Sequence, residues 1–493
     1  MSAAPEIFSL TNGSTLPWSE LPEWPVDTLV ATVATEIRRG GRLSAWFGVP
    51  EGDATRLVAI LAYDADNLLG AARSQPIRGS YPALTAACPQ GHLFEREVFE
   101  QHGLRPEGHP WLKPVRQWPA TGPATGDFFQ VSGSEVHEVA VGPVHAGIIE
   151  PGHFRFQCDG EEVMHLEIAL GYQHRGVEEM LRGGPHPATL AQIETVAGDS
   201  SIAHTTTHAM LLETLAGGEA PLRAQWLRAV ALELERLANH TGDLGALAND
   251  VAFLPTSSVC GRVRGDFLNL TALICGNRFG RGLVNPGGCR QDLEPERAKR
   301  LLAGLEVALT DVNQAAAWLW DASSVRARFE EVGTVTSEQA AEIGLVGPAA
   351  RACGLVRDVR YDHPAGWHRF AQAPVSVWPG GDVFARARVR ALEIQHAGKF
   401  IAEQLATPPE GPIRGGLAPL QPDTLGVALV EGWRGEICHV ALTDDRGRLR
   451  RYKIVDSSFH NWTGLALALR GQQISDFPIC NKSFNLSYCG FDL

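Results

Sequence analysis

Several long stretches between residues 201 and 321 repeat their apolar residues at the spacing of an α-helix. In the longest of these stretches, Glu233, Arg236 and His240 recur at helical spacing on a segment that is otherwise apolar. The pattern predicts a large, mainly α-helical domain. The stretches that predict it are SIAHTTTHAMLLETLAG, PLRAQWLRAVALELERLANHTGDLGALAND, GDFLNLTALICGNRFG and PERAKRLLAGLEVALTDVNQAAAWLWD.

The chain before these helices differs in composition from one region to the next. Residues 26–116 mix strand-like apolar runs such as LSAWFGV with amphipathic helical stretches, which predicts a small α/β domain. Residues 117–134 are rich in Pro, Gly and Thr and are interpreted as a linker. Residues 1–25 are interpreted as an N-terminal extension, and residues 135–493 as the second domain.

The second domain combines strand and helix patterns. A short β-like section carrying HFRFQ and EEVMHLEIAL precedes its helical stretches. Near its end, the run TLGVALVEGWRGEICHVALTDDRGRLRRYKIV predicts a hairpin that turns at Asp444 to Gly447. We therefore predict an α+β fold, with a small N-terminal α/β domain followed by a large mainly α-helical domain that contains short β elements.

The composition bears on the class of function. The chain has 493 residues, a formal net charge of −13 and 44% hydrophobic residues, which is typical of a soluble globular protein and gives no support to a nucleic-acid partner. We expect no signal peptide, and no run of eighteen apolar residues occurs, so membrane association is expected to depend on partner subunits. The nine cysteines are scattered without a CxxC pair, which is typical of a reducing cytoplasm and predicts no iron-sulfur site on this chain.

Two regions of the sequence carry specific motifs. The segment from Phe94 to Pro110, FEREVFEQHGLRPEGHP, resembles the E-R-E-x-x-D-x-x-G-x-x-x-x-G-H-P signature of the smaller hydrophilic subunit of respiratory complex I. The elements Gly142 to His145, Glu150 to Arg155 and Tyr172 to Glu178 resemble G-P-x-H, E-P-G-H-F-R and Y-x-H-R-G-x-E in the large subunits of membrane-bound hydrogenases. The chain is thus identified as a member of the superfamily of complex I and the membrane-bound (group 4) nickel-iron hydrogenases, with both domains fused as in formate hydrogenlyase. The resemblance implies a hydrogenase-large-subunit-like fold for the second domain.

In the hydrogenases of this superfamily, two pairs of cysteine thiolates hold a nickel-iron centre. The matching positions here are Ala197, Ser200, Ser487 and Gly490, and Cys489 lies one residue out of register. A hydroxyl or a glycine cannot replace a thiolate at a soft nickel site, so the resemblance implies no metal ligands, no nickel and no hydrogen chemistry. Taken alone, the C-terminal segment would better suit a packed chain end with two buried free cysteines, so the rest of the chain decides between the two interpretations.

The polar residues that remain near these positions are candidate catalytic groups. Asp199, Ser200 and His204 stand at the start of a helical stretch, where they could relay protons or bind a polar head group. Asp199 or Ser200 would equally suit a helix N-cap. His204 and His208 lie one turn apart and would also suit a divalent metal together with Asp199. Arg434 matches an arginine that overlooks the metal in hydrogenases, although a buried ion pair would explain it equally well.

A quinone remains a candidate ligand because complex I binds one at this place. Its quinone-binding tyrosine falls here on Gly198, so that partner is missing. Its second quinone-facing group is a histidine on a loop between strands, for which His145, Glu150 and His153 compete. No G-x-G-x-x-G motif follows a predicted strand, so NAD is expected to take part only through the complex.

His174 and Arg175 match a histidine-arginine pair that lies close to an iron-sulfur cluster of a neighbouring subunit in complex I. Positive charge at such a place stabilises the reduced cluster. The resemblance implies that His240 faces the same cluster. The alternative for Arg175 is a salt bridge along its helix to Glu178 or Glu179.

These observations predict a peripheral subunit of a membrane-bound, energy-converting oxidoreductase complex of the NADH-quinone oxidoreductase and hydrogenase class. The subunit would support electron or proton transfer without a nickel-iron site, and no cofactor is expected on this chain itself. The expected partners are a small iron-sulfur subunit, a ferredoxin-like subunit and antiporter-like membrane subunits, at the cytoplasmic, inner face of the cell membrane. The alternative is a catalytically silent scaffold that couples conformational changes between other subunits.

Overall fold

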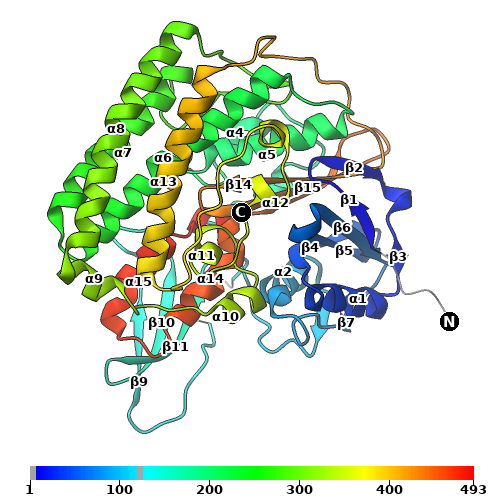
Figure 1. The fold of residues 1–493 in the computed structure, drawn as a ribbon. Helices are drawn as coiled ribbons and strands as arrows, with labels where there is room; N and C mark the ends of the chain where they lie inside the picture. Colours follow the sequence, from blue (N-terminus) through cyan, green and yellow to red (C-terminus); the bar gives the residue numbers. More distant parts are fainter. Residues whose placement is uncertain (1–6, 119–125) are drawn as a thin grey trace.

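The computed structural model describes residues 7–118 and 126–493. In Figure 1 a small lobe, coloured blue, lies beside a larger lobe with long green and orange helices. The first lobe mixes helices with strands and the second is dominated by helices, so the predicted α+β class is confirmed. The predicted linker, residues 117–134, lies partly outside the described residues.

The small lobe is built on a five-stranded sheet that packs against helices α1 and α2. Strands β4 and β5 are almost continuously apolar because both of their faces are buried. The sheet has the order β1-β6-β5-β4, and β3 pairs with β6. The elements of this lobe are β1 (Phe8–Leu10), β3 (Glu23–Trp24), α1 (Val26–Arg38), β4 (Arg42–Glu51), β5 (Ala54–Tyr63), β6 (Leu68–Ser74), β7 (Ser80–Pro82), α2 (His92–His102) and β8 (Arg105–Glu107).

The predicted N-terminal extension connects the two lobes. Residues 1–6 lie outside the described residues, and the following segment supplies β1 to the small lobe and β2 (Ser14–Pro17) to the large one, where it pairs with β14 (Thr424–Gly432). The side-chain amide of Asn12 donates to the carbonyl oxygens of His363 at 2.8 Å and Leu429 at 2.9 Å. This segment is therefore fixed between distant parts of the sequence.

Long helices form the core of the large lobe, and the predicted helical stretches are confirmed. Helix α6 is buried along nearly its whole length and packs against α5, α7 and α13. Helix α7 ends where Gly276 adopts a left-handed conformation with φ 77°, which suits a helix C-cap. Figure 1 shows α6, α7, α8 and α13 side by side. Their bounds are α5 (Ser201–Leu215), α6 (Leu222–Asp250), α7 (Leu254–Cys275), α8 (Pro295–Asp321) and α13 (Val383–Ala406).

A four-stranded sheet of order β16-β15-β14-β2 lies against α5. Its strands β15 (Gly435–Thr443) and β16 (Leu449–Val455) are joined at Asp444 to Gly447, as predicted. The predicted single hairpin is nevertheless wrong in one respect, because a second, two-residue turn at Trp433 and Arg434 joins β14 to β15. This additional turn holds Arg434 at the end of a buried sheet.

The remaining elements are a small three-stranded sheet, two short strands and several helices of at most twelve residues. Strands β9, β10 and β11 form a separate sheet of order β11-β10-β9. The bounds are β9 (Val136–Val141), β10 (His153–Asp159), β11 (Glu162–Ala169), α3 (Val177–Met180), α4 (Thr189–Ile193), β12 (Val284–Asn285), β13 (Gly288–Cys289), α9 (Ser323–Phe329), α10 (Ser337–Glu342), α11 (Gly347–Arg351), α12 (Val359–Asp362), α14 (Ser457–Ala468), α15 (Phe477–Phe484) and α16 (Tyr488–Phe491).

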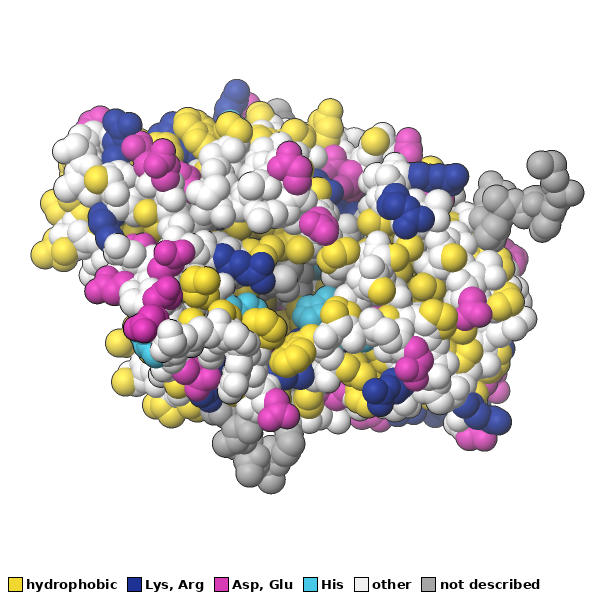
Figure 2. Space-filling model, turned by 90° about the horizontal axis from the view of Figure 1, so that it is seen from below, with side chains coloured by type: hydrophobic (Ala, Val, Ile, Leu, Met, Phe, Trp, Pro, Cys, Tyr) yellow, Lys and Arg dark blue, Asp and Glu magenta, His cyan; other side chains and the backbone are white. Residues whose placement is uncertain are grey.

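The surface of the molecule mixes charged and apolar side chains. Figure 2 views it from below and shows hydrophobic and histidine side chains around a hollow near the centre of this face. Acidic and basic side chains are interspersed over the same face. Within the two described segments, no helix combines the length and the apolar character needed to cross a lipid bilayer.

Candidate functional site

A cavity of about 570 Å³ lies where the C-terminal segment meets the loop between β9 and β10. We call it the tail cavity, and its walls are residues 143–151, Asp199, Arg434, Lys482 and residues 485–488. These parts come from four separate regions of the sequence. The tail cavity brings together the predicted residues His145, Glu150, Asp199, Arg434 and Ser487.

Arg434 and Asp199 form a bidentate ion pair on the wall of the tail cavity. The two guanidinium nitrogens donate to the two carboxylate oxygens at 2.6 Å and 2.7 Å. The Nε of Arg434 donates to the carbonyl oxygen of Asn485 at 2.5 Å, and its guanidinium lies over the ring of Trp433 at 3.9 Å. Burial opposes the charge, but the carboxylate of Asp199 outweighs it and raises the pKa of Arg434. The pair therefore joins the segment before α5 to the C-terminal segment.

The predicted helix cap by Asp199 or Ser200 is wrong. Ser200 occupies the N-cap position of α5, but its side chain makes no capping hydrogen bond. The carboxylate of Glu235 on α6 accepts from the backbone N–H groups of Ile202 at 2.7 Å and Ala203 at 3.2 Å. Burial raises the pKa of Glu235 to about 8 against these hydrogen bonds, which lower it. Asp199 is thus left free to pair with Arg434.

The structure brings together the two segments that match the nickel-iron ligand motifs. Arg175 connects them, because one of its nitrogens donates to the carbonyl oxygens of both Val196 and Cys489 at 3.1 Å. Ala197 is fully buried beside the first of these carbonyl groups. Ser200 is also buried.

Ser487 and Gly490 have structural roles in α16. The Oγ of Ser487 accepts from the backbone N–H of Gly490 at 2.9 Å and so caps this short helix. A Cβ atom at Gly490 would lie 2.8 Å from Cγ of Asp456, so this position has no room for a side chain. The thiol of Cys489 lies 3.4 Å from the Ser487 hydroxyl and donates to Glu150 at 3.5 Å.

The three candidates on the loop between β9 and β10 are placed differently. Nε2 of His145 lies 2.8 Å from the carbonyl oxygen of Gly152, and Glu150 accepts from the N–H groups of Tyr488 and Cys489 at 3.1 Å. Both residues line the tail cavity. His153 is buried on β10 outside the cavity lining, and burial lowers its pKa. The geometry therefore separates His153 from the other two.

His204 belongs to a buried chain of hydrogen bonds behind the tail cavity, which we call the histidine chain. Nε2 of His204 lies 3.0 Å from Oδ2 of Asp456, and its Nδ1 lies 3.1 Å from Nε2 of His439. Nδ1 of His439 lies 2.9 Å from the hydroxyl of Tyr452, which lies 2.8 Å from Nδ1 of His208. All five side chains are buried.

The histidine chain can carry a proton. In one assignment every donor meets an acceptor, since His208 donates to Tyr452, Tyr452 to His439, His439 to His204, and His204 to Asp456. If each donor passes its proton along this row, Asp456 becomes protonated, and Nε2 of His208 must take up a proton from outside the chain so that this ring stays neutral. Burial lowers the pKa of His208 to about 4 and that of His439 well below its ordinary value, so both rings are neutral at pH 7. Burial opposes ionisation of Asp456, but His204 and Arg434 outweigh it and lower its pKa.

Two of these five side chains, His204 and His208, were candidates from the sequence alone. His439 lies between apolar residues on β15, where a polar side chain at a buried strand position was the available signal. Tyr452 lies beside Arg451 and Lys453 on β16 and gave no such signal. Asp456 directly precedes α14, and its carboxylate accepts from the backbone N–H of Ser458 at 2.8 Å. A capping pattern was therefore visible, but its contact with His204 depends on residues far apart in sequence.

The divalent-metal alternative does not match the contacts of its three residues. Asp199 turns to Arg434, whereas His204 and His208 both belong to the histidine chain. Among the residues that the structure describes, no group of three or more His, Cys, Asp or Glu is arranged to hold a metal ion.

His174 and Arg175 are exposed beside the C-terminus. Nδ1 of His174 lies 2.6 Å from a backbone oxygen of Leu493. The predicted salt-bridge alternative for Arg175 is wrong, because its nitrogens bind backbone carbonyl groups while Glu178 binds Lys453.

His240 does not share this exposed surface. It is fully buried in the helical core, where its Nε2 lies 2.7 Å from a carboxylate oxygen of Glu393. Glu393 also accepts from Arg351 at 2.7 Å and from Arg236 at 3.3 Å. His240 is therefore part of an internal ionic network and can act on a neighbouring subunit only through other residues.

Comparisons with known proteins agree with this architecture. Residues 250–419 match the family described as "Respiratory-chain NADH dehydrogenase, 49 Kd subunit". The chain is 30% identical over 433 residues to formate hydrogenlyase subunit 5 of Escherichia coli, covering 83% of this chain and 76% of that protein. It is 27% identical over 370 residues to NADH-quinone oxidoreductase subunit 4 of Thermus thermophilus, covering 70% of this chain and 90% of that protein.

A similar fold occurs in a solved structure of the membrane-bound sulfane sulfur reductase, an archaeal respiratory membrane complex. The TM-score is 0.66 at 24% sequence identity, and the match covers 73% of this chain and 99% of the other. At this level of identity the likeness concerns the fold. Relatives identified by sequence are named as subunits of membrane-bound hydrogenases and NADH-quinone oxidoreductases.

Proposed function

The chain belongs to the family that unites the large subunits of membrane-bound hydrogenases with the 49 kDa subunit of respiratory-chain NADH dehydrogenase. On this premise we propose that it is a peripheral subunit of a membrane-bound, energy-converting oxidoreductase complex. Its place would be on the inner face of the cell membrane, among antiporter-like membrane subunits. The family membership supports the class of complex. The role within it depends on the chemistry of the tail cavity and the histidine chain.

The role we propose is proton transfer linked to electron transfer at the tail cavity. The histidine chain carries this proposal, because Asp456 at one end of it packs against Gly490 directly behind the cavity. A change of charge in the cavity would alter the proton affinity of Asp456 through Arg434, whose charge already acts on that carboxylate. The polar head group of an electron acceptor, such as a quinone, would fit beside His145 and Arg434.

We further propose that the tail cavity holds no nickel-iron centre. The residues at the ligand positions offer a methyl group, two hydroxyls and a glycine, which are not ligands for nickel. The nearby thiol of Cys489 has a pKa raised by burial and contacts Glu150, which disfavours the thiolate form. The bidentate pair of Asp199 and Arg434 lies on the cavity wall instead.

A partner iron-sulfur subunit would dock at the surface that carries His174 and Arg175. Both side chains are exposed, and Arg175 is positioned by carbonyl groups from both motif segments. A fixed positive charge at this surface would stabilise a reduced cluster in the partner. A ferredoxin-like subunit would then complete the electron path, with NAD involved only elsewhere in the complex.

The test uses the assembled complex in membranes, with electron transfer to a water-soluble quinone or a viologen dye as the readout. Asp456→Asn and His439→Phe should each lower the rate by about 100-fold, because a broken chain removes the proton path. His460→Phe is the matched control, since His460 is a buried histidine outside the histidine chain. An unchanged rate in both histidine-chain variants, with assembly intact, would favour a catalytically silent scaffold. Stoichiometric nickel in the complex would contradict the proposed absence of a nickel-iron centre.

A further inference from the structure

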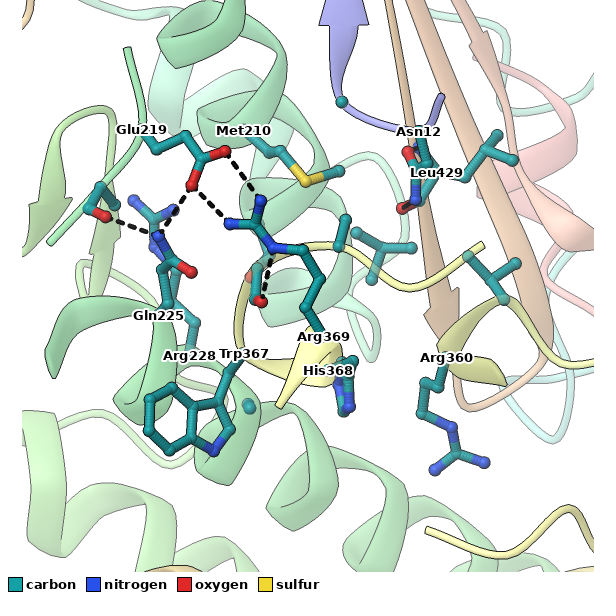
Figure 3. A pocket seen from close by; sticks show the side chains of 18 of the residues that line it. Asn12, Met210, Glu219, Gln225, Arg228, Arg360, Trp367, His368, Arg369 and Leu429 are labelled. Atoms are coloured by element: carbon teal, nitrogen blue, oxygen red, sulfur yellow. Dashed lines mark hydrogen bonds and ion pairs between the residues drawn. The ribbon is translucent and has the colours of Figure 1, made fainter. Parts of the chain in front are cut away.

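A second cavity, of about 90 Å³, has no part in the proposed function. It is lined by Thr206 and Met210 of α5, whereas His204 and His208 of the same helix belong to the histidine chain. We call it the inner cavity. Figure 3 shows Gln225 and Arg228 of α6 on one side of it and Arg360 and His368 on the other. Its walls come from the segment 12–13, residues 206–214 of α5, residues 218–232, residues 359–369 and residues 429–431 of β14.

The inner cavity is lined by polar atoms that have no protein partner among the described residues. Gln225 and Arg228 are more than nine-tenths buried, yet Oε1 of Gln225 and Nε of Arg228 make no hydrogen bond. Both ring nitrogens of His368 lack a partner as well, and burial lowers the pKa of this ring to about 4, so it is neutral. The six unpartnered atoms in the lining are Thr206 Oγ1, Gln225 Oε1, Arg228 Nε, His363 Nδ1, and Nδ1 and Nε2 of His368.

Thr206 differs in this respect from its neighbours on α5. The hydroxyls of its neighbours Thr205 and Thr207 donate to helix carbonyl oxygens at 2.6 Å and 2.8 Å. Thr206, which faces the cavity between them, makes no such bond. Buried polar atoms without partners are costly, and several around one space indicate a site for a polar guest.

The charges around the inner cavity balance one another. Glu213 accepts from Arg228 at 2.7 Å and 3.1 Å, and Glu219 at the mouth pairs with Arg369. The lining therefore holds equal numbers of acidic and basic side chains. The charged lining residues are Glu213, Glu219, Glu431, Arg228, Arg360 and Arg369.

We propose that the inner cavity binds a small, neutral molecule that carries an amide or lactam group on an apolar ring. The unpartnered atoms include both donors, such as Arg228 Nε, and acceptors, such as Gln225 Oε1, which an amide satisfies together. Met210, Leu232 and Trp367 supply apolar walls for the ring. One water molecule, which has a single heavy atom, needs roughly 10–15 Å³ of such a cavity. The inner cavity of about 90 Å³ therefore accommodates a molecule of about six to nine heavy atoms.

The mouth of the inner cavity can open at small cost. The pair between Glu219 and Arg369 crosses it, and both side chains are substantially exposed, at 57% and 40%. An exposed pair of this kind contributes little to stability, so its separation does not limit entry.

The proposal is tested by isothermal titration calorimetry of the full-length protein with benzamide, which has the required size and amide group. We expect a Kd below about 1 mM, which corresponds to about 4 kcal/mol of binding free energy. Thr206→Val and His368→Phe should each weaken binding by about five-fold or more, since each removes a polar partner. Thr207→Val is the matched control on the same helix and should bind as the unmodified chain does. Melting curves confirm that every variant is folded.

Two related probes examine the proposed chemistry. Benzoate, with the same shape and a negative charge, should bind at least ten-fold more weakly because the lining is already charge-balanced. Acetophenone, which lacks the amide donor, should also bind more weakly. The proposal is overturned if benzamide does not bind at its solubility limit, if benzoate binds more tightly, or if all three variants bind benzamide equally.

Discussion

The tail cavity and the inner cavity lie along the same helix but satisfy their polar groups in opposite ways. At the start of α5, the polar groups of the tail cavity bind one another, as Asp199 does with Arg434 and Glu150 with the backbone of α16. Further along α5, the hydroxyl of Thr206 and five other polar atoms around the inner cavity have no protein partner among the described residues. The first cavity is therefore stabilised by its own residues, whereas the second is left dependent on a guest.

This difference indicates that the polar groups of the inner cavity lower the stability of the unliganded protein. Proteins commonly retain unfavourable groups at functional sites, where their removal increases stability and reduces function. Substitutions that remove a polar group should therefore destabilise the tail cavity and stabilise the inner one. The following predictions test this opposition, from the largest expected effect to the smallest.

Arg434→Met should have the largest effect. The substitution leaves the carboxylate of Asp199 and the carbonyl group of Asn485 without their donor, so unfolding should become easier by about 3 kcal/mol. Urea denaturation followed by tryptophan fluorescence measures this change. The double variant Asp199→Asn with Arg434→Met should recover part of the loss, because no unpaired carboxylate remains. Equal losses in the single and double variants would contradict the pairing argument.

Glu235 predicts a pH dependence at the tail-cavity end of α5. Its pKa is about 8 in the folded protein, above the ordinary value of 4.5, so the folded state binds more protons between these values. The contribution of Glu235 to stability is therefore present at low pH and is lost as pH rises towards 8. Glu235→Gln should remove this loss, so that its stability relative to the unmodified chain improves by about 2 kcal/mol between pH 6.0 and pH 7.5. Parallel stability curves for the two proteins would refute the raised pKa.

Much of the fold could be predicted from the sequence, because helices reveal themselves through local periodicity. The apolar spacing in α5, α6 and α8 is a property of neighbouring residues, and the motifs around Asp199 and Ser487 predicted that two distant segments meet. The pairing of β2 with β14 could not be predicted, since it joins residues some four hundred positions apart. Local patterns show which face of a strand is buried but not which strand lies beside it.

The same limit applies to the sites. Glu235 replaces the expected cap of α5 from a neighbouring helix, and the histidine chain connects α5 to two strands. No pattern among neighbouring residues in the sequence predicts either contact. The inner cavity is still less predictable, because its walls come from widely separated segments and its signal is the absence of partners, which only the folded structure reveals.

His368→Phe should have a moderate and opposite effect to Arg434→Met. Phenylalanine keeps the stacking that the ring makes with Phe400 and removes two nitrogens that have no partner. We expect the unliganded protein to gain about 1 kcal/mol of stability, measured by urea denaturation. His439→Phe is the comparison, because it removes two hydrogen-bonded nitrogens from the histidine chain and should destabilise the fold. Destabilisation by both variants to the same extent would remove the distinction between the two cavities.

The smallest effect is expected at the mouth of the inner cavity, where Glu219 and Arg369 form the same kind of carboxylate-guanidinium pair as Asp199 and Arg434. The pairs differ strongly in burial, because the side chain of Arg434 is 5% exposed and that of Arg369 is 40% exposed. Water competes for the exposed pair and salt screens it, so a double-mutant cycle with Glu219→Gln and Arg369→Gln should give a coupling below about 0.5 kcal/mol. The corresponding cycle for Asp199 and Arg434 should give several times that value. A coupling at the mouth as large as that at the tail cavity would mean that the mouth is held closed, and that entry of a guest requires more than the separation of one exposed pair.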